Sequence, residues 1–214
     1  MHPMPEIEST DGITCQIALR RRLIVVAGFA SFIKAAPAQI TSNTFRGRPV
    51  AVTEQRHDFR LQGPDGRWYG MADFKGRVVL LFFGYTQCPD ACPTELARMA
   101  RLMEMLGPDG ERVRVIFVTV DPERDTPDIM RAYPAMFSPE FLGLRGSMEN
   151  TLAAATALKV YFEKMPGRTP TTYTVDHSTF VYGFDSQGIL RVRLTPSMSA
   201  DDVYADVRTL LNMQ

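Results

Sequence analysis

The sequence predicts an α/β domain in which a mixed β-sheet is flanked by helices. Two continuous apolar runs, 78–83 and 113–120, are typical of strands buried on both faces. Between them, residues 94–106 carry apolar side chains at helical spacing, which predicts a right-handed β-α-β unit. With 214 residues, 45% of them hydrophobic, the chain is long enough for one buried core and gives no reason to expect two.

Shorter elements are expected around this unit. Residues 59–62 and 67–70 predict an N-terminal β-hairpin, because the Gly-Pro-Asp-Gly sequence between them favours a turn. Thr126 and Pro127 begin a second helix, which Pro134 ends or kinks. This order suits an elaborated thioredoxin-like fold with an additional N-terminal hairpin. The remaining predicted elements are a strand at 141–145, a helix capped by Ser147, an antiparallel hairpin of 179–184 and 189–194, and a closing helix after Ser199.

The first 38 residues are interpreted as a leader. Arginines at 20–22 precede an apolar run at 23–33, and Ala36-Pro37-Ala38 follows, which is the order of a secretory signal peptide. The run is too short to span a bilayer as a helix, so cleavage after Ala38 is favoured. An uncleaved membrane anchor is the alternative, because the apolar stretch extends past Lys34. Both readings predict the bacterial periplasm, with the domain either soluble or anchored to the inner membrane.

Composition and charge restrict the partners of the exported part. Residues 39–56 predict a linker or a loosely held lead-in strand, and residues 57–214 predict the functional domain. The chain has 24 basic and 24 acidic residues. No basic field is therefore expected to attract nucleic acid, and partners are expected to recognise a local site.

Cys88 and Cys92 follow the first buried strand, where the next helix starts. Pro93 is tolerated only in a first helical turn, which places Cys92 at the helix entrance. Ligands of open α/β sheets bind beyond this end of the strands, and the positive end of the helix favours thiolates. Two buried structural cysteines or a static disulfide are the alternative, but a bridge across three residues gains little loop entropy. A reactive or metal-binding pair explains the spacing better.

His177 is the third candidate residue. It lies just before the strand predicted at 179–184, in a loop where thioredoxin-like oxidoreductases usually carry a cis-proline facing the cysteines. Asp176-His177-Ser178-Thr179 offers no proline there. A loop histidine held by a backbone hydrogen bond is the alternative interpretation. Asp176 is expected either to orient the imidazole or to cap a turn.

Three separated motifs carry a resemblance to a known family. They are Phe83-Gly84-Tyr85-Thr86-Gln87-Cys88-Pro89-Asp90-Ala91-Cys92-Pro93, then Asp121-Pro122-Glu123-Arg124-Asp125-Thr126-Pro127, then Val175-Asp176-His177-Ser178. In this order they resemble the Sco/SenC family, and the similarity covers about residues 55–213. The resemblance implies a thioredoxin-like copper-binding protein of cytochrome c oxidase assembly. It also implies that Cys88, Cys92 and His177 are the copper ligands.

The chemistry of this donor set suits copper. Thiolates are soft donors for Cu(I), and an imidazole nitrogen lets the same site hold Cu(II). Structural zinc normally takes four protein ligands, and the exported sequence has no fourth cysteine or paired histidine. Met99, Met103 and Met105 have a helical spacing that indicates core packing rather than a thioether copper relay.

Two functions lead the hypotheses. The first is a metallochaperone that takes copper from a donor protein and helps to build the dinuclear copper centre of an oxidase subunit. The second is a thiol-disulfide oxidoreductase that uses Cys88 and Cys92 to reduce the cysteines of that subunit. A copper or redox sensor ranks lower. A peroxidase also ranks lower, because Thr86 is only two residues before Cys88, whereas a peroxidatic cysteine needs a Thr-x-x-Cys sequence.

The segment 121–125 follows the neighbouring buried strand and is expected to line the same crevice. Its structural role would be to end that strand and lead into the helix capped by Thr126. Its functional role would be to guide partner docking or to tune the pKa of the thiolates. The sequence favours neither role.

Overall fold

The structure is a computed structural model that describes residues 45–51, 57–167, 169 and 172–213. The chain divides into two units, Met1–Thr41 and Ser42–Gln214, and all described residues lie in the second. The predicted leader and most of the predicted linker therefore lie outside the described residues. No helix within the described ranges is long and apolar enough to cross a membrane.

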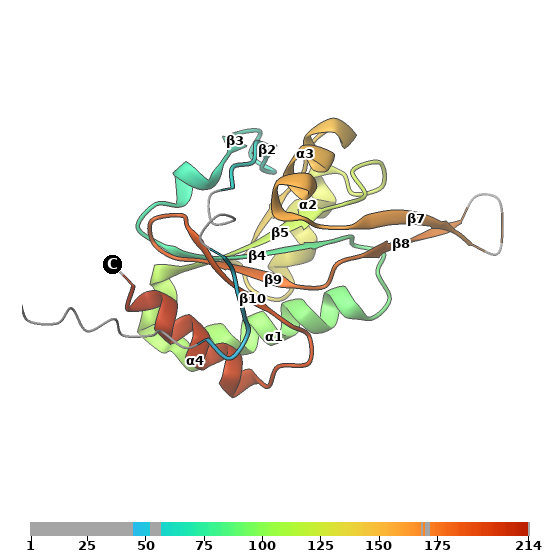
Figure 1. Cartoon of the computed structure of the whole chain (residues 1–214). Coiled ribbons are helices and arrows are strands. Elements are labelled where there is room, and N and C mark those ends of the chain that lie inside the picture. Colours follow the sequence, from blue (N-terminus) through green and yellow to red (C-terminus); the bar gives the residue numbers. More distant parts are fainter. Residues whose placement is uncertain (1–44, 52–56, 168, 170–171, 214) are drawn as a thin grey trace, which may run out of the picture. The chain divides into compact units, whose positions relative to one another are not determined.

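One mixed sheet forms the centre of the domain, in the order β1-β10-β9-β4-β5-β6 (Figure 1). β4, β5 and β6 are parallel, whereas β9, β10 and β1 continue the sheet beyond β4 with antiparallel pairings. Every residue of β4 is buried, which explains its continuous apolar sequence. The strands are β1 (Arg48–Pro49), β4 (Val78–Gly84), β5 (Val113–Thr119), β6 (Leu142–Leu144), β9 (Val181–Phe184) and β10 (Leu190–Leu194).

Helices cover both faces of this sheet. Leu80 and Phe82 of β4 pack with α1, α2 and α4, whereas Leu81 and Phe83 pack with α3 and η2 on the opposite face. Alternate residues of β4 thus enter two separate cores, as the pleat of a strand requires. The mixed sheet between helices confirms the predicted fold class. The helices are η2 (Met71–Phe74), α1 (Ala91–Leu106), η3 (Gly107–Arg112), α2 (Pro127–Ala135), α3 (Met148–Leu158) and α4 (Ala200–Leu211).

Most predicted helix ends agree with the structure. The Thr126 side chain accepts a hydrogen bond from the Ile129 N–H at the start of α2, and α2 ends one residue after Pro134. Ser147 and Ser199 cap α3 and α4 in the same way. α1 begins earlier than predicted, because its first turn includes both Cys92 and the proline that follows it.

Two β-hairpins lie outside the main sheet. The first, β2 (Leu61–Gln62) with β3 (Trp68–Tyr69), is the predicted N-terminal hairpin with shorter strands. The second, β7 (Phe162–Pro166) with β8 (Tyr173–His177), was not predicted and extends beyond the sheet (Figure 1). Most of β7 is exposed, so its sequence lacks the apolar alternation of a half-buried strand. The prediction that His177 lies in a loop is wrong, because it is the last residue of β8.

Two further predictions concern β1 and the methionines. β1 pairs with β10, and the Gly47 N–H donates to Asp206 at 2.8 Å, so this part of 39–56 is a lead-in strand. Met99 is fully buried between α1 and the sheet, and Met103 packs against the same core. Core packing of these two methionines is therefore confirmed, while Met105 is half-buried.

The carboxylate of Asp125 links the loop after β5 to the loop after β4. It is fully buried, and it accepts hydrogen bonds from the Thr86 N–H at 3.1 Å and the Thr86 hydroxyl at 2.5 Å. The Thr119 hydroxyl donates to it at 2.5 Å. Burial raises the pKa of Asp125, and these hydrogen bonds oppose that rise. The carboxylate therefore holds the loop that carries Cys88 against the central strands.

We expect Asp125→Ala to lower the free energy of unfolding by about 3 kcal/mol, because the hydroxyl of the buried Thr119 and two donors of the half-buried Thr86 lose their acceptor. Asp128→Ala is the control, since that carboxylate is 88% exposed and pairs with Arg131 at the surface. Its removal is expected to cost about 0–1 kcal/mol. Urea denaturation of both variants measures the difference, and equal costs would contradict the structural role of Asp125.

Candidate metal centre

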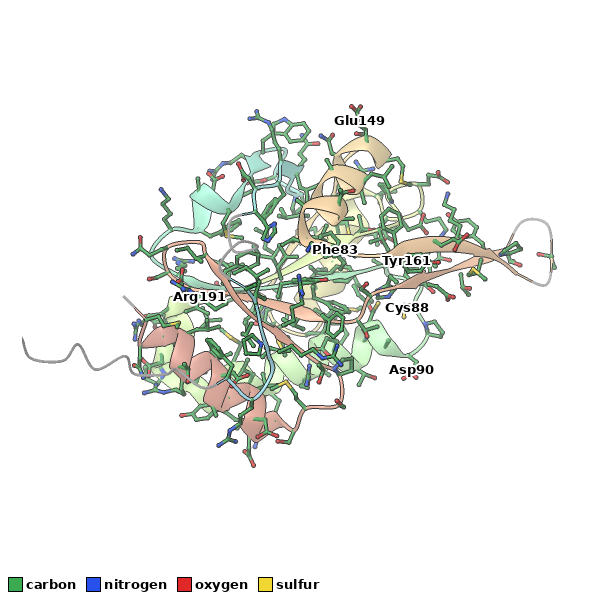
Figure 2. The ribbon with its side chains drawn as sticks, in the orientation of Figure 1. Phe83, Cys88, Asp90, Glu149, Tyr161 and Arg191 are labelled. Carbon is green, nitrogen blue, oxygen red and sulfur yellow. The ribbon has the colours of Figure 1, made fainter. Side chains whose placement is uncertain are left out.

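Cys88 and Cys92 lie at the carboxyl end of β4. Cys88 belongs to the turn between β4 and α1, and Cys92 is the second residue of α1, as predicted for a helix entrance. Both cysteines are free, with Cys88 half-buried and Cys92 fully buried. Figure 2 labels Cys88 at the end of the sheet from which the β7–β8 hairpin extends. This is the sheet edge where the sequence placed a ligand site.

Gly84, the last residue of β4, makes room for the Cys92 sulfur. A Cβ atom at this position would lie 2.6 Å from Cys92 Sγ and 2.7 Å from the ring of Phe117. Real Cβ atoms do not approach other atoms so closely, so only glycine lets the start of α1 rest on the strand here.

The β7–β8 hairpin brings His177 to the cysteines. Its Nε2 lies 3.5 Å from Cys92 Sγ, and its Nδ1 lies 3.0 Å from the backbone oxygen of Ser178. Because a carbonyl oxygen only accepts hydrogen bonds, Nδ1 must be the donor in this contact. In the neutral ring, Nε2 then keeps its lone pair and directs it to the sulfurs. This arrangement presents Nε2 as a metal ligand.

The imidazole of His177 is not oriented by Asp176, which was one of the two roles expected for that residue. Asp176 is exposed, and the carbonyl of Ser178 orients the ring instead. The rings of Tyr85 and Phe82 meet the imidazole edge-on, with centroids 5.9 and 6.1 Å away. Aromatic packing and one backbone hydrogen bond thus fix the orientation of the histidine.

One donor atom each from Cys88, Cys92 and His177 lies within 4.8 Å of the other two. Ligands at about 2.0–2.3 Å from one metal ion are at most about 4.6 Å apart, so only small movements would close the site around an ion. The cysteines come from the turn after β4 and the start of α1, and the histidine comes from β8. The fold therefore brings together three donor residues that lie up to 89 positions apart in the sequence.

The two thiols differ in acidity. The hydrogen bond from the Cys92 side chain, the largest cause, lowers the pKa of Cys88 to about 3 against the opposing effect of burial. Backbone N–H groups at the start of α1 lower it further, and the Cys92 N–H lies 3.4 Å from Cys88 Sγ. The same side-chain hydrogen bond and burial raise the pKa of Cys92. Loss of a proton is therefore favoured at Cys88 over Cys92.

Arg124 ties the cysteine loop to the hairpin that carries His177. Its guanidinium donates to the Gln87 side chain at 3.1 Å and to the backbone oxygen of Tyr173 at 3.0 Å. It also lies 3.6 Å from the centroid of the Tyr173 ring. Asp121, which is fully buried, accepts from Arg124 and from the Tyr173 hydroxyl, the latter at 2.9 Å.

These contacts give the segment 121–125 a structural role. The carboxylates of Asp121 and Asp125 are buried and fully engaged with neighbouring loops. Glu123 pairs with Lys164 of β7 at 2.7 Å, which adds a surface contact to the same hairpin. The role in partner docking stays a prediction.

Sequence reasoning missed the residues that join the two halves of the site. Arg124 stands in the second of the quoted motifs, and its position after a buried strand is the signal that could have singled it out. Tyr173 belongs to the hairpin that was not predicted. The contact of Tyr85 with the imidazole depends on that hairpin too.

The fold and this site define a class, a thioredoxin-like domain with a Cys-x-x-x-Cys turn and a histidine from a separate hairpin. The family model described as SCO1/SenC matches residues 47–212. The chain belongs to this family, as the motifs predicted.

Relatives and solved structures agree with this assignment. The mitochondrial protein SCO2 homolog of Bos taurus is 35% identical over 89% of this chain and 75% of its own length. Apo Sco1 from Thermus thermophilus is 41% identical, covers 80% of this chain and 99% of its own, and has a TM-score of 0.71. Bradyrhizobium japonicum ScoI with copper bound is 34% identical, covers 72% and 98%, and has a TM-score of 0.66.

We expect iodoacetamide to modify Cys88 of the metal-free, reduced chain at least about tenfold faster than Cys92. Cys88 is half-buried and has a lowered pKa, whereas Cys92 is fully buried and its hydrogen bond with Cys88 raises its pKa. Peptide mass spectrometry after short labelling at pH 6 measures the ratio. Faster labelling of Cys92, or equal rates, would contradict the assigned asymmetry.

Arg124→Met is expected to speed hydrogen exchange of the β8 amides by about tenfold or more, because charge-assisted hydrogen bonds to the hairpin are lost. Arg101→Met serves as the matched control, since its side chain is 67% exposed and pairs with Glu104 on α1. Exchange measured by mass spectrometry on the metal-free chain compares the two. Unchanged exchange in β8 of Arg124→Met would show that the hairpin is held by other contacts.

Proposed function

We propose that this chain is a copper metallochaperone that binds one copper ion through Cys88, Cys92 and His177. The observation that carries the proposal is the convergence of two sulfurs and one imidazole nitrogen within 4.8 Å. The copper-bound ScoI structure with a similar fold supports copper as the metal. Two soft sulfur donors suit Cu(I), and the additional nitrogen donor suits Cu(II) as well.

Copper is the cargo of the proposed reaction, and the burial of the ligands suggests how it is exchanged. Cys88 is the more accessible of the two sulfurs, so ligands of a partner reach the ion at its side. Cys92 and His177 are held by the start of α1 and the end of β8 and retain the ion until the partner has engaged. The proposed partners are a copper donor protein and the subunit of cytochrome c oxidase that receives copper for its dinuclear centre.

Thiol-disulfide exchange is the second candidate function, and the unequal exposure of the two cysteines favours it. The Cys88 thiolate would attack a disulfide of the oxidase subunit, forming a mixed disulfide and releasing one thiolate of the subunit. Cys92 would then lose its proton and attack Cys88 Sγ, releasing the second subunit thiolate. The subunit disulfide is reduced, and Cys88 and Cys92 of this chain end as a disulfide. This reaction needs no histidine.

The place of action is proposed from the N-terminal sequence. The arginines at 20–22 and the apolar run at 23–33 support export, with residues 1–38 as a signal peptide or a membrane anchor and 39–56 as the linker to the domain. A periplasmic domain, soluble or attached to the inner membrane, meets oxidase subunits on the side where their copper centre is built.

His177→Ala distinguishes the two functions. For a chaperone, we expect weaker binding of copper by the purified chain, a changed Cu(II)-thiolate absorption, and failure of oxidase assembly in cells at limiting copper. Added copper would partly restore assembly by mass action. The rate of reduction of the Cys88–Cys92 disulfide by a small thiol is expected to change little, because exchange depends on the thiolates.

His57→Ala is the matched control, because His57 lies beside Met71 and Gly188, away from the cysteines. It is expected to bind copper as the unmodified chain does. Normal oxidase assembly by His177→Ala at the lowest copper, with unchanged exchange kinetics, would rule out the chaperone and favour the reductase. Copper spectra of His177→Ala identical to those of the unmodified chain would remove the histidine from the ligand set.

A further inference from the structure

A second feature of the domain is a surface hollow of about 440 Å³ at the end of the sheet opposite to the cysteines. Arg77 immediately precedes β4, and Arg114 is the second residue of β5, so both lie at the amino ends of the parallel strands. The cysteines follow the carboxyl end of β4. β3 and η2 contribute Tyr69 and Phe74 to the wall of the hollow. The hollow is thus separated from the metal centre by the length of the central strands.

Positive charge dominates the lining of this hollow. Four cationic side chains line it, and Asp73 is the one acidic residue among the residues that line it. Asp73 is already engaged, because its carboxylate accepts the Gly70 N–H at 2.8 Å. Within the described ranges, neither Lys75 nor Arg77 forms an ion pair. The four cations are Arg67, Lys75, Arg77 and Arg114.

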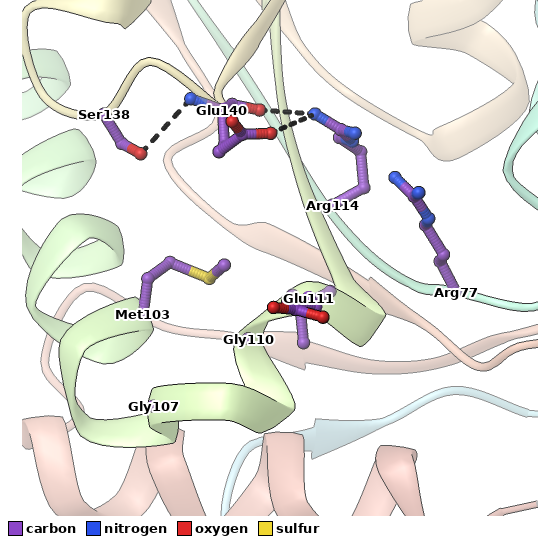
Figure 3. A pocket seen from close by; sticks show the side chains of 9 residues that line it. Arg77, Met103, Gly107, Gly110, Glu111, Arg114, Ser138 and Glu140 are labelled. Carbon is purple, nitrogen blue, oxygen red and sulfur yellow. Dashed lines mark hydrogen bonds and ion pairs between the residues drawn. The ribbon is translucent and has the colours of Figure 1, made fainter.

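The strand register directs two of these arginines to the same face. Arg114 pairs with Val79, and Arg77 lies two residues before Val79, so alternation places both side chains on the side of β2, β3 and η2. Both also line a neighbouring hollow of about 460 Å³, where Figure 3 shows the Arg114 guanidinium directed to Glu140. Burial, and next the nearby charge of Arg77, lower the pKa of Arg114.

The remaining cations are only partly neutralised. Arg114 donates to the backbone oxygen of Glu140 at 2.6 Å, while the Glu140 carboxylate lies 3.7 Å away and is 75% exposed. Arg67 is exposed and lies over the ring of Tyr69, 5.1 Å from its centroid. Like charges held this close repel each other unless an anion lies between them.

We propose that this hollow binds a phosphate group. Guanidinium groups form paired hydrogen bonds with phosphate oxygens. The several oxygens of one phosphate group match donors from the residues just before β3 and β4, from the end of η2 and from β5. The phosphate belongs either to a small soluble phosphate compound or to the headgroup of an anionic lipid. In both cases the ligand binds at the end of the sheet opposite to the cysteines and leaves the cysteine end free.

The test uses the full-length chain and two probes, inorganic phosphate followed by calorimetric titration and vesicles followed by co-sedimentation. One vesicle set contains phosphatidylglycerol, and the other contains only phosphatidylcholine. The double variant Arg77→Ser with Arg114→Gln is expected to weaken binding of the active probe by about tenfold or more. Arg101→Gln, an exposed arginine on α1, is the control and is expected to leave binding unchanged.

The probe that binds identifies the source of the phosphate. Saturable binding of inorganic phosphate that the double variant loses supports a soluble ligand. Binding only to phosphatidylglycerol vesicles, lost in the same variant, supports a lipid headgroup. If neither probe binds, or if Arg101→Gln weakens binding as much, the proposal is overturned. Thermal unfolding measures whether each variant is folded. If the double variant does not fold, the single variant Arg77→Ser is tested by the same criteria. Arg77 is exposed, so its replacement is not expected to disturb the core.

Discussion

The guanidinium of Arg124 is the contact on which the candidate metal centre depends. It hydrogen-bonds with the cysteine loop at Gln87 and with the β7–β8 hairpin at Tyr173, and it is held by the buried carboxylate of Asp121. Without this contact, the hairpin would be attached near the site by the hydrogen bond of the Tyr173 hydroxyl with Asp121, by the partly exposed Lys164–Glu123 pair and by the packing of the buried Val175. Through this contact, the base of the hairpin that carries His177 is fixed to the loop that carries Cys88.

Two buried carboxylates on one short segment each hold one part of the candidate metal centre in place. Asp121 fixes the hairpin through Arg124 and Tyr173, and Asp125 fixes the cysteine loop through Thr86. Buried carboxylates are costly unless their oxygens are hydrogen-bonded, so both loops must be in place for the segment to be stable. The positions of the sulfurs and of the imidazole are therefore coupled through the loop after β5, although no ligand belongs to that loop.

The two ends of the parallel strands have different chemistry. At the carboxyl end, a helix start, a thiolate and an oriented imidazole favour a soft metal ion. At the amino end, cations from just before β3 and β4, from the end of η2 and from β5 line a hollow that has one acidic residue in its lining. Parallel strands produce this separation, because all of their carboxyl ends lie on one edge and all of their amino ends lie on the other.

The local patterns in the sequence were sufficient to determine much of this protein. The apolar runs of β4 and β5, the caps Thr126 and Ser199, and Pro93 after Cys92 each act within a few residues, so they could be interpreted without the fold. The motifs were sufficient to indicate the family and the three candidate ligands. The distances among those candidate ligands could not be predicted from the sequence, because the three residues lie far apart in the chain.

Only the tertiary structure decided how the histidine reaches the cysteines. β7 and β8 are stabilised by pairing with each other and by contacts such as that of Tyr173 with Arg124, and a mostly exposed strand leaves no apolar alternation in the sequence. The same holds for the orientation of the imidazole, which a backbone carbonyl rather than Asp176 provides. The cationic hollow likewise exists only because the register of β4 with β5 places Arg77 and Arg114 on one face. The periodicity of apolar residues in the sequence indicates which face of one helix or strand is buried. These features instead depend on contacts between different elements, which that periodicity does not indicate.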